Sequence, residues 1–226
     1  MNNEVILYSG GMDSFILSKM YPRALKVYYD LRTRYSRKEI CHLPHDVIVD
    51  TSINLAALEQ ADSIVEYRNL MLVTAAAAKY GDRILLGATS GDLNADNTET
   101  FAQRASEMLT YLSVRPRAVT VELPMRRKSK CDLVAWYVAE GYDPQALART
   151  VSCYDAEHPY CGGCKSCIRK WLAQEAYGVG GTPWLVNPQN LDWQGPRLQG
   201  MRGLWWNSQK EQMQVMTVFE KYGIRL

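Results

Sequence analysis

The stretch VILYSGGMDS, residues 5–14, decides the fold class of this chain. Its first four residues are apolar and typical of a short buried strand. The next six residues are Ser9, Gly10, Gly11, Met12, Asp13 and Ser14. Paired glycines allow a sharp turn and a close approach of backbone amides to a ligand, and a helix that begins here favours an anion at its N-terminus. An ordinary strand-to-helix turn has the same composition, so the stretch alone leaves both interpretations open.

The composition indicates a globular protein. The chain has 226 residues, of which 47% are hydrophobic, enough for one core or for a core with a small appendage. A formal net charge of +2 neither indicates nor excludes nucleic-acid binding. No apolar run reaches the roughly 20 residues that span a bilayer, and residues 1–4 lead into the first strand without an export signal. We therefore expect a cytoplasmic protein without membrane contact.

Strand-like and helix-like segments alternate through the first 150 residues. The strand-like segments are residues 4–8, 24–29, 46–50, 83–87 and 118–123, and the helix-like segments are residues 13–20, 68–80, 98–112 and 130–140. This alternation predicts an α/β fold with a Rossmann-like parallel sheet of about five strands and helices on both faces. Ligands of such sheets bind at the carboxyl ends of the strands, so the loop after the first strand is a natural ligand site.

The chain changes character near residue 178, where Gly, Asn, Gln and Trp become frequent before a final helix-like segment at residues 208–222. We expect the tryptophans of this tail to cover apolar surface rather than to stack on bases. They are Trp184, Trp193, Trp205 and Trp206. The sequence therefore predicts a nucleotide-binding domain at residues 1–150, a small four-cysteine helical region at 151–177 and a C-terminal extension at 178–226.

Four of the six cysteines lie within fifteen positions, at Cys153, Cys161, Cys164 and Cys167. Two overlapping C-x-x-C turns let the sulfurs converge on one tetrahedral ion, and Zn²⁺ held by four cysteines is normally structural because no position stays open to substrate. A disulfide framework is not expected in a chain with a large core and no export signal. An iron–sulfur cluster, reactive thiols, and His158 as a ligand are alternatives that the spacing leaves open.

The order of motifs resembles one family. SGGMDS is similar to the S-G-G-x-D-S pyrophosphate loop of the N-type ATP pyrophosphatases (the PP-loop superfamily), and the Walker pattern is absent. EYRNLML, ILLGATSGD, LPMRRKSKCDLV and SCYDAEHPYCGGCKSC follow in the order of the 7-cyano-7-deazaguanine synthase (QueC) family, so the resemblance runs from about residue 5 to residue 173. It implies an ATP-dependent ligase of queuosine biosynthesis, which converts 7-carboxy-7-deazaguanine and ammonia to 7-cyano-7-deazaguanine through an acyl-adenylate and an amide.

The resemblance also implies the site residues. ATP would be bound by Ser9, Gly10, Gly11, Met12, Asp13, Ser14 and Gly87, with Mg²⁺ shared among its phosphate oxygens. Lys130, Asp13 and Arg68 would be catalytic. The substrate would be bound by Arg68, Asn69, Asp92 and Asp96, although the two aspartates could instead cap their own loops. Zn²⁺ would be bound by Cys153, Cys161, Cys164 and Cys167.

Two segments depart from the family pattern. The family's Y-P-D-C-R reads NADNT at residues 94–98, and its Y-G-Q-R-H reads YDLRT at residues 29–33. These departures leave open an enzyme that stops at the 7-amido-7-deazaguanine, or one that joins the activated deazapurine to another amine.

Two interpretations from other classes also stay open. They are a PP-loop tRNA sulfurtransferase and a zinc-bearing nucleic-acid-binding module that uses the MRRKSK run at residues 125–130. Nucleic acid is not the partner we expect, because such a charge run is more often a solvated face. The expected partners are a small deazapurine and ammonia, and a homodimer is compatible with the chain.

Overall fold

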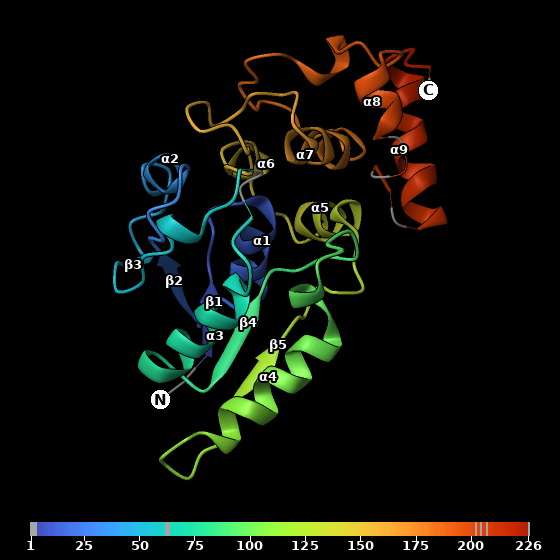
Figure 1. The fold of residues 1–226 in the computed structure, drawn as a ribbon. Coiled ribbons are helices and arrows are strands. Elements are labelled where there is room, and N and C mark those ends of the chain that lie inside the picture. Colours follow the sequence, from blue (N-terminus) through green and yellow to red (C-terminus); the bar gives the residue numbers. More distant parts are fainter. Residues whose placement is uncertain (1–3, 62–63, 202, 204, 207, 226) are drawn as a thin grey trace. The chain divides into compact units, whose positions relative to one another are not determined.

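The computed structural model describes residues 4–61, 64–201, 203, 205–206 and 208–225. Its packing divides the chain into two compact units, Met1–Arg127 and Lys128–Leu226. The first unit contains a parallel sheet with the strand order β3-β2-β1-β4-β5 (Figure 1). The strands are β1 (Glu4–Leu7), β2 (Leu25–Tyr29), β3 (Ile48–Asp50), β4 (Arg83–Leu86) and β5 (Thr120–Glu122). The predicted α/β fold with five parallel strands is confirmed, and each predicted strand end lies within two residues of the observed one.

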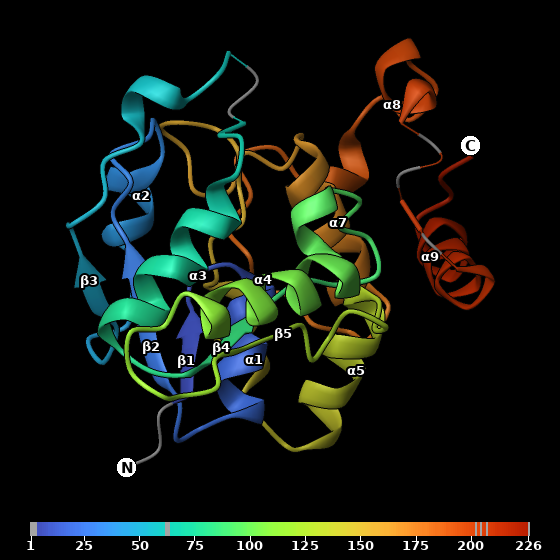
Figure 2. The same cartoon turned by 60° about the horizontal axis from the view of Figure 1, so that its bottom comes forward.

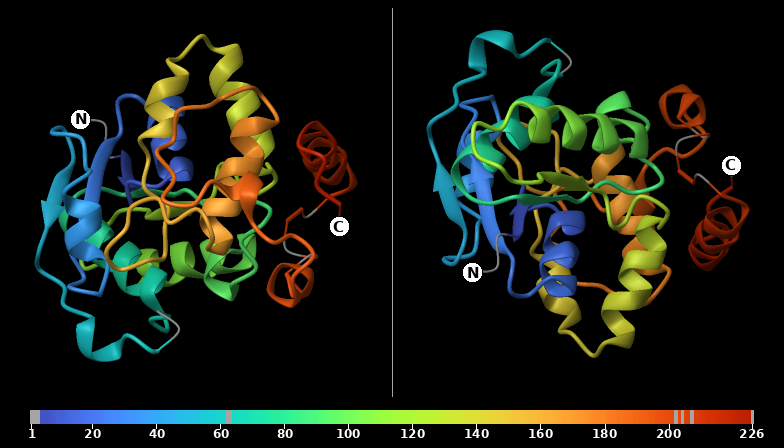
Figure 3. Two further views of the ribbon diagram at one scale, coloured as in Figure 1. Left: turned by 90° about the horizontal axis from the view of Figure 1, so that it is seen from above. Right: turned by 90° about the horizontal axis from the view of Figure 1, so that it is seen from below.

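Helices cover both faces of this sheet, as predicted. Helix α1 (Met12–Met20) lies on one face, and α3 (Arg68–Lys79) and α4 (Glu99–Tyr111) lie side by side on the other (Figures 2 and 3). Alternate strand residues point to opposite faces, so Val5 and Ile84 pack with Val73 and Ala105 of α3 and α4. The unit also contains α2 (Ser36–Ile40) and short 3-10 helices at Ala56–Leu58 and Ala95–Asn97.

The carboxyl end of β3 is fixed to the end of α3 by Asp50. Its buried carboxylate accepts hydrogen bonds from Lys79 Nζ at 2.9 Å, Tyr80 Oη at 2.6 Å and the Ser52 N–H at 2.8 Å. Burial alone would raise the pKa of Asp50, but these hydrogen bonds outweigh it and hold the pKa below its usual range. This link fixes one end of the sheet edge.

The second unit is helical. Its elements are α5 (Lys130–Ala139), α6 (Pro144–Ala148), α7 (Lys165–Glu175), a 3-10 helix at Pro188–Asn190, α8 (Pro196–Gly200) and α9 (Gln209–Lys221). Helix α7 shares a core with the extension, which includes α9; Trp193 and Trp205 are buried in this core, and Trp184 and Trp206 are partly buried against it. The prediction that these four tryptophans cover apolar surface is confirmed. The functional division at residues 150 and 178 stays a prediction. No helix in the described ranges is long and apolar enough to cross a membrane.

Candidate functional site

The loop between β1 and α1 is closed by two serines. The Ser9 N–H donates to Ser14 Oγ at 3.2 Å, the two hydroxyl oxygens lie 3.2 Å apart, and Ser14 Oγ donates to the Gly11 carbonyl at 3.1 Å. The Gly11 N–H in turn donates to Ser9 Oγ at 3.4 Å. Helix α1 begins directly afterwards, and its N-cap, Gly11, has no capping side chain. The loop therefore presents a helix N-terminus, which favours a phosphate or another anion.

The end of β4 packs directly against this loop. A Cβ atom added to Gly87 would lie 3.2 Å from the Ser14 nitrogen and 3.4 Å from the Asp13 carbonyl carbon. A side chain at this position would crowd the backbone of the loop, so Gly87 lets the end of β4 pack closely on it. A contribution of Gly87 to ATP binding stays a prediction. Strand β1 lies between β2 and β4, where the strand order reverses, and this is the place at which open α/β sheets bind ligands.

Asn69 of α3 contacts the segment that contains Asp96. Asn69, in the first turn of α3, donates from Nδ2 to the Asp96 carbonyl at 3.2 Å and to Asn97 Oδ1 at 2.9 Å. The structure thus joins Asn69 to the segment of Asp96. The carboxylate of Asp92 accepts from both the N–H and the hydroxyl of Thr89, at 2.6 and 2.9 Å, so it caps its own loop. A substrate-binding role for these residues stays a prediction.

A surface cavity of about 370 Å³, open to solvent, lies after the carboxyl end of β2. Its polar lining residues are Asp30, Arg32, Thr33, Ser36, Arg37 and Cys41. The segment after α2 also reaches the phosphate loop, because a Cβ atom on Gly10 would lie 3.3 Å from Leu43 Cδ2. In the sequence, residues 29–33 stand out only as a departure from a family pattern. Arg37 and Cys41 were missed because they lie in and directly after α2, a short helix without apolar periodicity.

A buried acid in α2 was also missed. Glu39 Oε2 accepts a hydrogen bond of 2.8 Å from Tyr28 Oη. Burial raises the pKa of Glu39, while the hydrogen bond from Tyr28 and the positive charges of Lys38 and Arg68 oppose the rise. The exposed Arg68 therefore faces an acid of α2 at the carboxyl side of the sheet. This gives Arg68 a local electrostatic partner in addition to any substrate.

The four clustered cysteines converge on one point in the second unit. The sulfurs of Cys153, Cys161, Cys164 and Cys167 all lie within 4.8 Å of one another, and the Cys161 and Cys167 sulfurs lie 3.9 Å apart. A tetrahedral ion with bonds of about 2.3 Å to sulfur needs sulfurs about 3.8 Å apart, so the donor set fits a single Zn²⁺. Backbone N–H groups of residues 155, 161 and 167 point at the cysteine sulfurs, which favours thiolates.

The extension holds the turn between the cysteines. The Leu185 N–H donates to the Tyr160 carbonyl at 2.7 Å, and the Val186 N–H donates to the Cys161 carbonyl at 3.3 Å. Gly162 has φ +80°, and a Cβ atom there would lie only 1.7 Å from the Val186 carbonyl oxygen. Farther along the extension, Arg197 donates to the Gly163 carbonyl at 2.6 Å. The extension is therefore part of the cysteine site, which sequence reasoning did not foresee.

The family assignment follows from comparison with known proteins. The model of the family described as "Queuosine biosynthesis protein QueC" matches residues 43–178. The chain belongs to the QueC family.

Relatives of known function agree with this assignment. The 7-cyano-7-deazaguanine synthase of Psychromonas ingrahamii is 26% identical over 212 residues, which cover 77% of this chain and 94% of the relative. The enzymes of the same name from Chromohalobacter salexigens and Campylobacter curvus are each 27% identical, and the alignments cover 77% and 79% of this chain and 82% and 96% of the relatives. This QueC-family chain is thus similar to the synthases over most of its length.

The lysine proposed for catalysis begins a helix of the second unit. Lys130 is buried at the start of α5, next to a capping box in which Ser129 Oγ accepts from the Asp132 N–H and Asp132 accepts from the Ser129 N–H, both at 3.0 Å. Asp132 also forms an ion pair of 2.5 Å with Lys210 of α9. Asp132 thus caps α5 in this QueC-family chain, and the contribution of Lys130 to ATP chemistry stays a prediction.

Proposed function

We propose that this chain uses ATP to convert 7-carboxy-7-deazaguanine and ammonia to 7-cyano-7-deazaguanine. The observation that supports this most directly is the Ser9–Ser14 loop at the N-terminus of α1, because it suits the polyphosphate of ATP in a chain of the QueC family. The relatives are named for the product 7-cyano-7-deazaguanine, and the strand order places a typical ligand-binding position at the carboxyl end of β1.

The proposed reaction uses two activations. A carboxylate oxygen of the substrate attacks the α-phosphorus of ATP, and pyrophosphate leaves; ammonia then attacks the carbonyl carbon, and AMP leaves with formation of the amide. The amide oxygen attacks the α-phosphorus of a second ATP and a second pyrophosphate leaves; loss of AMP and of two N–H protons then gives the nitrile. The protein mainly has to align the attack and to stabilise negative charge on the phosphates.

Individual residues have proposed roles in this reaction. Ser9, Gly10, Gly11, Met12 and Ser14 would hold the departing pyrophosphate, with Gly87 allowing the loop to pack on β4. Mg²⁺, when bound, would neutralise phosphate charge, and Asp13 would orient the loop or reach the ion through water. Lys130 and Arg68 would neutralise the transferring phosphate. Asp92 and Asp96 are proposed on the side of the deazapurine and ammonia.

A related outcome is favoured by the segment at residues 94–98. This segment departs from the family pattern at the place where Asn69 joins the loop of Asp96 and Asn97. An enzyme with an altered acceptor region could release the amide, or transfer the activated deazapurine to another amine. Mass spectrometry separates these products, because the nitrile is lighter than the amide by one water.

The contacts of this chain disfavour the other two classes. Cys131 is buried and its pKa is raised by burial to about 12, so among cysteines outside the cluster only Cys41 is an exposed thiol. In the basic run, Arg126 donates to the Thr89 carbonyl at 2.5 Å and Arg127 pairs with Glu99 at 2.9 Å. The chain thus offers neither a pair of reactive cysteines for sulfur transfer nor an open basic surface for nucleic acid, so the synthase is the better interpretation.

Zn²⁺ is the proposed structural ion of the four cysteines. The donor set is complete without a substrate position, so the ion would stabilise the fold of residues 153–167 rather than take part in the reaction.

One experiment tests the proposed reaction as a whole. The purified chain is incubated with ATP, Mg²⁺, ammonia and 7-carboxy-7-deazaguanine, and AMP, pyrophosphate and the product mass are measured together. We expect AMP and pyrophosphate together with a product whose mass equals that of the substrate plus one ammonia minus two waters. Reactions without ammonia and without deazapurine are the controls. Absence of AMP formation that depends on the deazapurine would overturn the proposal.

A further inference from the structure

Two arginines line the cavity after β2 and form no ion pair with the residues that the structure describes. Arg32 and Arg37 are both exposed and both line the cavity, together with one acid, Asp30. Across the part of the chain that the structure describes, neither guanidinium group forms a hydrogen bond or an ion pair. Asp30 directs Oδ1 to the backbone N–H of Arg32, at 3.0 Å. The cavity is therefore a place where cationic groups are available to a bound molecule.

Arg32 is held in an unusual backbone conformation by its neighbours. Its φ is +57°, in the left-handed region that side chains other than Gly, Asn and Asp seldom adopt. The bond from Arg32 to Asp30 fixes one side of the residue. On the other side, the Thr33 N–H donates to Ser36 Oγ at 3.1 Å. Strained residues persist where their surroundings over-determine them, often at ligand sites.

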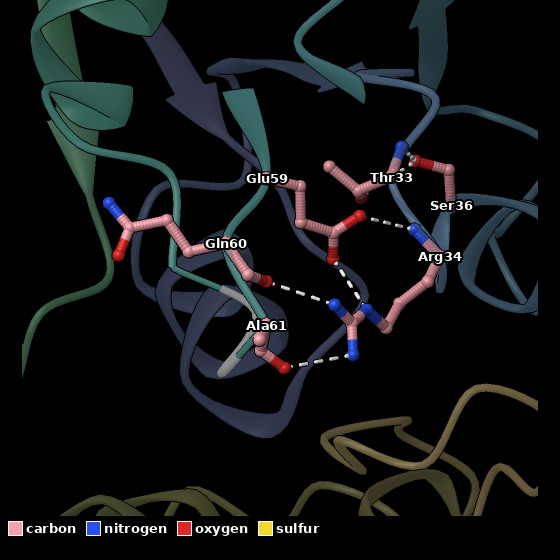
Figure 4. Close-up of polar contacts among 6 residues, drawn as sticks. All are labelled: Thr33, Arg34, Ser36, Glu59, Gln60 and Ala61. Atoms are coloured by element: carbon pink, nitrogen blue, oxygen red, sulfur yellow. Dashed lines mark hydrogen bonds and ion pairs between the residues drawn. The ribbon is translucent and has the colours of Figure 1, made fainter. Parts of the chain in front are cut away.

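Arg34 fixes the same loop to the loop after β3 (Figure 4). Its backbone N–H and its Nε donate to the two carboxylate oxygens of Glu59, at 3.0 and 2.9 Å. Its Nη2 and Nη1 donate to the carbonyls of Gln60 and Ala61, at 2.9 and 3.2 Å. Each of the three guanidinium nitrogens of Arg34 thus donates a hydrogen bond to the loop after β3. It positions the loop and leaves Arg32 and Arg37 as the arginines that can bind a ligand.

We propose that Arg32 and Arg37 bind the carboxylate of the acceptor and so select a carboxy-deazapurine over its neutral analogues, with Arg34 as a positioning residue. This inference rests on the proposed function and adds to it the residues that recognise the anionic substrate. A guanidinium group forms strong charge-assisted hydrogen bonds to a carboxylate, and bonds that converge on one carboxylate oxygen leave the other available to attack ATP. The contact of Leu43 with Gly10 brings the segment beyond this cavity to the phosphate loop.

The phosphates of ATP are the other oxyanions that these arginines could bind. The acceptor is favoured because the Ser9–Ser14 loop and the N-terminus of α1 already form a phosphate-binding arrangement after β1. The cavity lies instead after β2, in the region where the sequence departs from the family pattern. A comparison of the two anions therefore forms part of the test.

The test compares the binding of charged and neutral ligands by the zinc-loaded protein. Calorimetry measures the affinities of 7-carboxy-7-deazaguanine, of its neutral amide, and of a non-hydrolysable ATP analogue for the natural protein and for R32Q, R37Q and R32K. We expect R32Q and R37Q each to weaken carboxylate binding about 10- to 100-fold and amide binding less than 3-fold. The carboxylate affinity of R32K, which keeps the positive charge but not the guanidinium group, should lie between those of the natural protein and R32Q. R23Q is the matched control, since Arg23 is an exposed arginine at the opposite, amino end of β2.

Each other result overturns the inference in a recognisable way. Equal weakening of carboxylate and amide would assign the arginines a structural role, and selective weakening of the ATP analogue would assign them to the nucleotide. Carboxylate binding unchanged in both variants would exclude the cavity. If the natural protein binds neither deazapurine, the proposed function fails together with the inference, whereas binding with unchanged selectivity in R32Q and R37Q removes the inference alone. Unfolding temperatures of all variants establish that they are folded.

Discussion

Replacing Gly162 with alanine should destabilise the second unit by about 3 to 4 kcal/mol and weaken its zinc site. A left-handed conformation costs a side chain about 1 to 2 kcal/mol. In addition, the new Cβ atom would lie 1.7 Å from the Val186 carbonyl oxygen. Ordinary carbon-to-oxygen contacts are about 3.3 Å, so the two segments would have to separate by about 1.6 Å. That shift would break the bonds from Leu185 and Val186 to the turn, at about 1 kcal/mol each.

Gly178→Ala is the matched control for this prediction. Gly178 has φ +68° and follows α7, but a Cβ atom there would have no neighbour within 4 Å. It should therefore show only the backbone cost of about 1 to 2 kcal/mol. The difference of about 2 kcal/mol between the variants corresponds to about 4 to 8 °C in unfolding temperature for a chain of this length.

The assay combines thermal unfolding with zinc retention against a competing chelator. Gly162→Ala should unfold at lower temperature than Gly178→Ala and should lose zinc at lower chelator concentration, because Cys161 moves with the turn. Equal unfolding temperatures and equal zinc retention would refute the reasoning that the extension holds the metal site. Metal analysis that finds iron in the natural protein would overturn the zinc assignment itself.

Three further predictions concern the first unit and the free thiols. Ser14→Ala should slow pyrophosphate release about 10- to 100-fold, because Ser14 Oγ forms hydrogen bonds with three groups of the loop. Ser18→Ala, one turn later in α1, is the control and should leave the rate within about 3-fold. Equal rates in the two variants would contradict a role for the loop. The depressed pKa of Asp50 stabilises the fold above the unfolded value of about 3.9, and this contribution is lost as pH falls through the folded pKa. Asp50→Asn should therefore cost about 2 kcal/mol at pH 7 and clearly less near pH 2, as denaturant titrations at both pH values can check, and a pH-independent loss would argue against the charge. Cys41→Ser and Cys131→Ser should retain AMP formation within about 3-fold, and loss of activity in Cys41→Ser would revive the sulfurtransferase interpretation.

The strands and long helices could be predicted because their signals are local. Apolar β-branched runs, a glycine pair after β1 and amphipathic spacing in α3 and α4 each lie within a few residues of the structure that they specify. The short helices α2 and α8 were not predicted, since five polar-rich residues have no period to detect and depend on neighbouring segments for stability. Helix α6 does have a local signal, Asp143 capping a helix with Pro144 at its start.

The candidate site divides in the same way. The phosphate loop and the four cysteines are compact motifs, so their convergence followed from spacing. The clamp of Arg34 joins residues 25 positions apart, and the contact of Gly162 with Val186 joins the cysteine turn to the extension. No local pattern specifies such pairs. The cavity after β2 therefore became visible only in three dimensions.

In the proposed reaction, the same cavity receives an anion first and a neutral amide second. Arg32 and Arg37 would favour the carboxylate, because a hydrogen bond to a charged group contributes about twice as much as one between neutral groups. The amide must then be retained by contacts to the deazapurine ring until the second activation. Asp96 and its neighbours, which Asn69 holds in place, are the proposed source of those contacts. Residues 29–33, part of which line the cavity, and residues 94–98 around Asp96 both depart from the family pattern. The balance between release of the amide and its conversion to the nitrile would thus be set by the contacts to the deazapurine ring, whereas the phosphate loop acts alike in both activations.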